Sequence, residues 1–205
     1  MDSMPNHQRS WVETFAEHGI TIDPTLPCLR EGEKALETCK WICARYQVSW
    51  SESKCADFVE EKRIRFRSFS GTGLFPQIEI ILASCEQQEI PMAMVTGSTV
   101  VNARKVLTDS LWSRFTACVT AEDVQNGKPH PEPYLRAASA MGVDPKDCLV
   151  IENAPFGIRS ARAAGCFVLA LTTTLSPDHL SEADRVIESH EEILEFISED
   201  RPWTT

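Results

Sequence analysis

Short apolar segments alternate with helical patterns after residue 76, and this alternation limits the fold more than any other feature of the sequence. The segments that read as strands are MAMVT (92–96), FTACVT (115–120), CLVIE (148–152), FVLAL (167–171) and, more weakly, ADRVI (183–187). Because they are apolar on both faces, they predict a parallel sheet covered by helices on both sides. We therefore expect an α/β fold, with ligands bound at the carboxyl ends of its strands.

The first 70 residues carry helical stripes and no strand signal. The stripes lie in WVETFAEHGI (11–20), GEKALETCKWICARY (32–46) and SESKCADFVEEKRIRFRSF (51–69). Gly19 predicts the end of the first helix, and Ser51 or Ser53 can cap the third. SGTGLFP (70–76) then interrupts the pattern with two glycines and a proline. The sequence thus predicts a helical domain over residues 1–70 and an α/β domain over residues 71–205.

Composition excludes some classes of partner. The 205 residues are 42% hydrophobic and 24% charged, with a net charge of −10, so a basic surface for nucleic acid is not expected. No apolar run approaches the roughly 20 residues of a membrane span, and we expect no membrane partner. The eight cysteines form no CxxC pair and several lie in apolar runs, which predicts buried free thiols and a cytoplasmic protein. Zinc or disulfides are the alternative, and no oligomeric state is indicated.

Thr96, Gly97 and Ser98 follow the first predicted strand and precede a helical pattern over 99–111. A hydroxyl, a glycine that allows close backbone approach and a helix N-terminus together favour a phosphate-binding site. The alternative is that Thr96 or Ser98 only caps the helix.

Lys128 follows the second predicted strand, between Gly127 and Pro129 in a loop that also contains Pro131 and Pro133. The prolines stiffen this loop and fix the direction in which the lysine points. A lysine held at this edge of the sheet can bind a phosphate and neutralise charge that develops during the reaction. The alternative is a solvated surface lysine.

Glu152 and Asn153 follow the third predicted strand, directly after the apolar residues CLVI. A charged residue in this position is costly unless it meets a partner or a metal ion. A carboxylate with an amide carbonyl suits Mg²⁺, which prefers oxygen ligands. The alternative is that Glu152 caps the turn that follows.

Together these segments resemble the haloacid dehalogenase (HAD) superfamily, in the subfamily IA group of phosphoglycolate phosphatase and β-phosphoglucomutase relatives. The resemblance is carried, in order, by MAMVTGS (92–98), GKPHPEPY (127–134), VIENAPFGIRSARAAG (150–165) and ALTTTL (170–175). DSMPNHQRSW (2–11) resembles the family segment that directly follows its first motif, so the resemblance covers essentially the whole chain. It implies a Rossmann-like core with a parallel sheet and a small helical cap.

The resemblance also implies roles for the residues at the strand ends. Thr96, Gly97 and Ser98 would bind the transferring phosphoryl group, and Lys128 would hold that group against the nucleophile. His7, early in the cap connection, would face the active site. Glu152 and Asn153 would lie at a Mg²⁺ site.

Two departures from the family pattern bear on activity. The family's first motif is a strand ending in Asp-x-Asp, whose first aspartate becomes phosphorylated and whose second is the general acid/base. No Asp-x-Asp occurs in the sequence, and Asp2 resembles a later acidic residue of that segment. We therefore expect the first, central strand to be missing, through a misassigned start, a partial gene or a genuine short form, and the 205 residues alone to be inactive. Asn153 stands where the family often has aspartate, which removes one charge from the metal site.

The implied function is a Mg²⁺-dependent phosphohydrolase that removes phosphate from a small phosphorylated metabolite through an aspartyl-phosphate. The alternatives are a β-phosphoglucomutase-like phosphomutase and a non-catalytic relative that binds a phosphorylated ligand. A carbon–halogen hydrolase is a further alternative, against which Lys128 and the metal-binding pair argue. Gly32 and Glu33 stand where relatives often place Gly-Arg, and we expect Glu33 to repel a second phosphate unless it only faces water.

Overall fold

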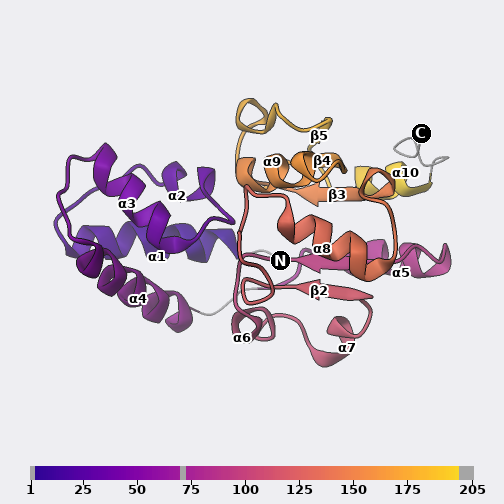
Figure 1. Ribbon diagram of the computed structural model, residues 1–205, viewed down its shortest axis with the longest axis horizontal. Coiled ribbons are helices and arrows are strands. Elements are labelled where there is room, and N and C mark those ends of the chain that lie inside the picture. The colour runs from indigo at the N-terminus through magenta and orange to yellow at the C-terminus, as the bar shows by residue number, and fades with distance from the viewer. Residues whose placement is uncertain (1–2, 70–72, 199–205) are drawn as a thin grey trace.

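The computed structural model describes residues 3–69 and 73–198. Its N-terminal helical part (α1–α4) lies to one side of the α/β part (α5–α10 and β1–β5), as Figure 1 shows. The predicted domain boundary at residues 70–71 lies outside the described residues. No helix in the described ranges is both long enough and apolar enough to cross a membrane.

The helical part contains α1 (Met4–Glu17), α2 (Thr25–Leu29), α3 (Ala35–Arg45) and α4 (Glu52–Ser68). Three of these were predicted, and the short α2 was not. Gly19 follows α1 with φ +75°, a conformation that glycine adopts without strain. Ser51 caps α4, since its side chain accepts a hydrogen bond from the Lys54 amide.

Large aromatic side chains fill the centre of the helical part. Phe15 of α1 and Phe58 of α4 are fully buried, with ring centroids 4.3 Å apart. Ile42 of α3 completes the contact from a third helix. The helical part therefore has an apolar core of its own.

In the described residues, the α/β part begins with α5 (Ile78–Gln87) and contains five strands. They are β1 (Ala93–Val95), β2 (Ala117–Val119), β3 (Leu149–Glu152), β4 (Phe167–Leu171) and β5 (Arg185–Ile187). The longer helices between and after them are α8 (Glu132–Met141), α9 (Pro155–Ala163) and α10 (Glu191–Ser198). Single 3₁₀ turns cover Pro145–Asp147 and Pro177–Leu180. All five predicted strands are confirmed, and no strand end differs from its predicted position by more than two residues.

The expected helix over residues 99–111 is wrong, because two short helices replace it. They are α6 (Val100–Ala103) and α7 (Asp109–Trp112). Thr99 and Thr108 each cap the helix that follows, which divides the segment. Between them Leu107 turns inward and is buried against α5 and α7, so tertiary packing overrides the helical pattern.

The strands form two parallel sheets in the described residues, ordered β1-β2 and β3-β4-β5. β4 is buried on both faces, as the continuous apolar pattern predicts. Val168 and Ala170 pack toward α8 and α9, whereas Leu169 and Leu171 pack toward α5 and α10. The result is an α/β/α arrangement in which the strands of each sheet run parallel. The predicted α/β class is confirmed.

Candidate active site

The loop after β1 is tied to the loop after β2 by backbone hydrogen bonds. The Thr96 amide donates to the Val119 carbonyl at 2.9 Å, and the Ala121 amide donates to the Ser98 carbonyl at 3.0 Å. The Thr96 hydroxyl accepts a hydrogen bond from the Ser98 amide at 3.1 Å. Neither Thr96 nor Ser98 caps the helix, since Thr99 does so, and α6 has only four residues. The alternative that Thr96 or Ser98 only caps the helix is therefore wrong, and the phosphate site stays a prediction.

The loop that carries Lys128 is held at several points. The amides of Gln125 and Asn126 donate to the Glu132 carboxylate at 2.8 and 2.9 Å. These backbone hydrogen bonds lower the pKa of Glu132 to about 2, so it stays ionised. The Ser160 hydroxyl of α9 donates to the His130 carbonyl at 2.6 Å. This anchoring, in addition to the prolines, fixes the loop's conformation.

Lys128 and Glu152 form a buried ion pair. Lys128 Nζ lies 2.5 Å from Glu152 Oε1, and the two side chains are 8% and 9% exposed. The Tyr134 hydroxyl donates to the same oxygen at 2.5 Å. Burial raises the pKa of Glu152, but the charge and hydrogen bond of Lys128 outweigh it and hold that pKa below its ordinary value. The alternative of a solvated Lys128 is wrong.

Glu152 lies against the first turns of α9, where only glycine fits. A Cβ atom on Gly157 would lie 2.1 Å from the Glu152 carboxyl carbon. The second oxygen of Glu152 accepts a hydrogen bond from the Asn153 amide at 3.0 Å, so Glu152 also holds the turn after β3. Thus Glu152 is oriented from three sides.

Asn153 is oriented by two threonines that follow β4. Its side-chain nitrogen donates to the hydroxyls of Thr173 and Thr174 at 3.4 and 3.2 Å, which leaves its side-chain oxygen as the acceptor. Mg²⁺ binds oxygen atoms and often combines one or two carboxylates with water and phosphate oxygens. Glu152 and Asn153 are donors of this kind, so they fit a Mg²⁺ site whose remaining ligands come from water, phosphate or further residues.

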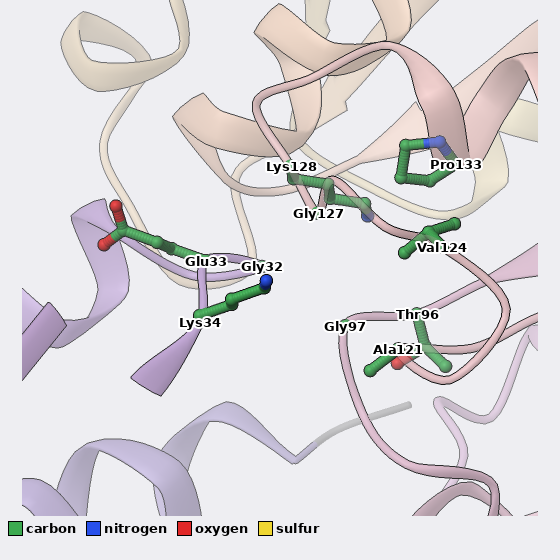
Figure 2. Close-up of a pocket in the computed structure, with 10 residues that line it drawn as sticks. All are labelled: Gly32, Glu33, Lys34, Thr96, Gly97, Ala121, Val124, Gly127, Lys128 and Pro133. Atoms are coloured by element: carbon green, nitrogen blue, oxygen red, sulfur yellow. The ribbon is translucent and has the colours of Figure 1, made fainter. Parts of the chain in front are cut away.

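A pocket lies between the helical part and the α/β part, as Figure 2 shows. It is lined by Gly32, Glu33, Lys34, Thr96, Gly97, Ala121, Val124, Gly127, Lys128 and Pro133. It therefore brings together three of the residues predicted to bind phosphate, on the loops that follow β1 and β2. Lys34, which the sequence analysis missed, points toward the same space.

Glycines allow the two parts to meet at this pocket. A Cβ atom on Gly32 would lie 2.8 Å from Lys128 Cδ, and one on Gly97 would lie 3.2 Å from Gly32 Cα. Gly32 also has φ +89°, which side-chain-bearing residues rarely adopt. Hence the loop between α2 and α3 can pack directly on the loops after β1 and β2.

Glu33 forms an ion pair with Arg30, which the sequence analysis did not predict. Its carboxylate accepts a hydrogen bond from Arg30 Nε at 2.6 Å and another from the Thr38 hydroxyl at 3.0 Å. In Figure 2 it points away from Gly97 and Lys128. The Arg30 guanidinium neutralises it, so the expected repulsion of a second phosphate does not follow from Glu33.

His7 lies in α1 and packs against α4, not among the pocket residues. Its ring stacks on Phe66, and its Nδ1 atom lies 3.0 Å from Lys62 Nζ. Burial, followed by the charge of Lys62, lowers the pKa of His7 to about 3. Burial also lowers the pKa of Lys62 to about 8. We therefore expect a neutral His7 that accepts a hydrogen bond from Lys62.

Glu31, which the sequence analysis did not single out, is a half-buried residue with an enclosed carboxylate oxygen. Burial, with the charge of Glu152 as the second cause, raises the pKa of Glu31 to about 7. Its Oε2 atom is buried without a hydrogen-bond partner among the described residues. The charges of Lys62 in the helical part and Lys128 after β2 both act on the Glu31 carboxylate. Glu31 therefore interacts electrostatically with both parts of the chain.

A sequence model described as haloacid dehalogenase-like hydrolase matches residues 34–171, about two thirds of the chain. The chain belongs to this family. Hexitol phosphatase A of Escherichia coli K12 is 30% identical over 94% of this chain and 88% of its own. Fructose-1-phosphate phosphatase YqaB of the same strain is 31% identical over 80% of this chain and 87% of its own.

Solved structures of the HAD family agree with the fold. A candidate β-phosphoglucomutase from Bacteroides vulgatus superposes with a TM-score of 0.82 at 28% identity, over 96% of this chain and 82% of its own. β-Phosphoglucomutase from Clostridium difficile superposes with a TM-score of 0.77 at 24% identity, over 95% of this chain and 90% of its own. At this identity, the similarity supports the fold alone. Both the family and the HAD fold inferred from the four ordered motifs are therefore confirmed.

Proposed function

We propose that this HAD-family chain binds the phosphoryl group of a small phosphorylated metabolite and belongs to a phosphohydrolase. The proposal rests chiefly on one observation, the convergence of Thr96, Gly97 and Lys128 on one pocket beneath the loop that contains Gly32. Residues 4–68 would act as a cap that encloses the substrate and excludes water, and the α/β part would carry the chemistry.

Lys128 is the residue best placed to bind a phosphate dianion. It is buried, charged and held by an anchored loop, so its interaction with an anion would be weakly screened by water. The Thr96 hydroxyl and the Gly97 amide would add hydrogen bonds to phosphate oxygens. Lys34 would approach from the cap, where its Nζ atom now lies 3.5 Å from the Gln125 carbonyl.

Glu152 and Asn153 would hold Mg²⁺ at the carboxyl end of β3. When bound there, Mg²⁺ would neutralise charge on the phosphate oxygens. Because Glu152 now pairs with Lys128, phosphate and metal together would give each of these groups a new partner of opposite charge. Phosphate and Mg²⁺ are therefore expected to bind cooperatively.

The attacking carboxylate is expected to come from outside the residues given. The sequence contains no Asp-x-Asp, and β1 and β3 belong to separate sheets. We propose that a strand inserted between β1 and β3 would join the two sheets and present the nucleophile beside Lys128. The 205 residues alone would bind phosphate without turnover.

The substrate class is inferred from relatives and from the pocket. Two relatives are named for hexitol and fructose-1-phosphate phosphatase activity, which favours a sugar or polyol phosphate. A phosphomutase is the second candidate, because Glu33 is neutralised by Arg30 and no longer argues against a second phosphate.

The test combines binding with turnover. Calorimetry with inorganic phosphate, with and without Mg²⁺, should give binding to the 205-residue chain that Lys128→Ala abolishes. The exposed Lys105→Ala is the matched control and should bind as the parent does. Phosphate release from sorbitol 6-phosphate and fructose 1-phosphate should be absent.

The outcomes separate the parts of the proposal. Turnover by the 205-residue chain would show that the nucleophile is present after all. Equal phosphate binding by the parent and Lys128→Ala would refute the phosphate site. A chain extended by about 10–20 residues of strand and loop that carry Asp-x-Asp should gain turnover. Transfer to a sugar hydroxyl, in place of release to water, would favour the phosphomutase.

A further inference from the structure

Three cysteines of the helical part converge at one point, and none of them lines the pocket. Cys39 and Cys43 lie one turn apart on the same face of α3, and Cys55 faces them from the first turns of α4. Their Sγ atoms all lie within 4.8 Å of one another. They come from two separate helices, so the helix packing and not the local sequence brings them together.

The three sulfurs are enclosed by apolar side chains. Cys39, Cys43 and Cys55 are 0%, 4% and 2% exposed, and they belong to the same apolar cluster as Phe15 and Phe58. All three side chains are therefore buried in the apolar core of the helical part.

We propose that Cys39, Cys43 and Cys55 form a three-sulfur binding site for a soft monovalent metal ion of the Cu(I) type. Three sulfurs around one ion, with bonds of about 2.3 Å, lie about 4.0 Å apart, so the observed spacing needs only a small contraction. Sulfur ligands select soft ions.

Zn²⁺ fits this group less well. A structural Zn²⁺ site takes four ligands, and in the described part of the chain no fourth histidine, cysteine or carboxylate joins the three sulfurs. Water is a poor fourth ligand, because the apolar walls give it no hydrogen-bond partners. A monovalent ion is also neutralised by a single thiolate, which limits the charge that must be buried.

The experiment uses the reduced 205-residue chain under anaerobic conditions. Cu(I) is supplied as its bicinchoninate complex, and transfer to the protein is followed by loss of the complex's visible absorbance. The expected result is one equivalent bound per chain and a higher thermal unfolding midpoint, because only the folded state assembles the site. X-ray absorption should show three sulfur ligands.

Matched variants locate the ion. Cys55→Ala should weaken binding by more than the roughly 10–100-fold that loss of an outer partner costs, and Cys43→Ala should do the same. Cys166→Ala is the control, because Cys166 is a buried thiol beside Cys148 in the α/β part. Its affinity should equal that of the parent.

Several results would overturn the proposal. The proposal fails if the parent retains no Cu(I), if Cys55→Ala binds Cu(I) as tightly as the parent does, or if the control Cys166→Ala loses Cu(I) binding. X-ray absorption that shows only two sulfur ligands would also overturn it. Circular dichroism of each variant shows whether it is folded. If Cys55→Ala does not fold, Cys43→Ala and the sulfur count by X-ray absorption decide the question.

Discussion

Replacing Lys128 by methionine tests the ion pair at the centre of the site. The substitution keeps most of the side-chain volume and removes the charge next to Glu152, which is only 9% exposed. Breaking a buried ion pair by removing one partner costs about 3–5 kcal/mol. The hydrogen bonds from Tyr134 and the Asn153 amide to Glu152 remain. We therefore expect a stability loss at the lower end of this range, about 3 kcal/mol. Against a total stability of about 5–15 kcal/mol this is a large loss.

The pH dependence of the loss has a defined sign. In the parent, the pKa of Glu152 is depressed, so its stabilisation is present above the unfolded-state value of about 4.3 and fades as pH falls through the folded value. Without Lys128, burial dominates and the pKa of Glu152 rises above 4.3. Relative to the parent, the variant should then regain stability as pH falls from 7 toward 5, since Glu152 takes up a proton.

Urea unfolding followed by tryptophan fluorescence measures both effects. With a slope of about 2.5 kcal/mol per M for a chain of this size, a loss of about 3 kcal/mol lowers the midpoint by about 1 M. Lys128→Met combined with Glu152→Gln is the control and should recover part of the loss at pH 7, because no unpaired charge remains. The reasoning would be refuted if Lys128→Met alone lowered the free energy of unfolding by less than about 1 kcal/mol. It would also be refuted if the stability of Lys128→Met kept the pH slope of the parent.

Two further predictions concern His7 and Gly157. Since the pKa of His7 is lowered to about 3, its proton is bound only in the unfolded state between about pH 3 and 6.5, and stability should rise with pH there by up to about 1.4 kcal/mol per unit. His7→Gln should flatten this slope, and NMR titration of the parent should show a neutral ring at pH 5; a His7 that titrates near 6.5 contradicts the burial argument. Gly157→Ala should displace the Glu152 carboxylate and weaken phosphate and Mg²⁺ binding together. Gly73→Ala, where a Cβ meets nothing within 4 Å, should leave both unchanged, and equal binding by the two variants would rule out the contact.

The sequence alone determined the elements and the residue types at the strand ends. Continuous apolar runs predicted the strands, and helical periodicity predicted all but the shortest helices, because both signals are local. The order of the motifs around Thr96, Lys128 and Glu152 was enough to identify the family. The helix over 99–111 failed because Thr99 and Thr108 act as caps, which periodicity does not register.

Only the tertiary structure decided how the charges are paired. Lys128 and Glu152 are 24 positions apart, and their pairing depends on how β2 and β3 are placed in the fold. The enclosure of the Glu31 carboxylate and the contact of Gly32 with Lys128 arise where the helical part packs on the α/β part. Likewise, Cys55 reaches Cys39 only because α3 and α4 pack side by side. Local sequence sets which groups are available, but long-range packing sets their distances and their access to water, and these decide charge and reactivity.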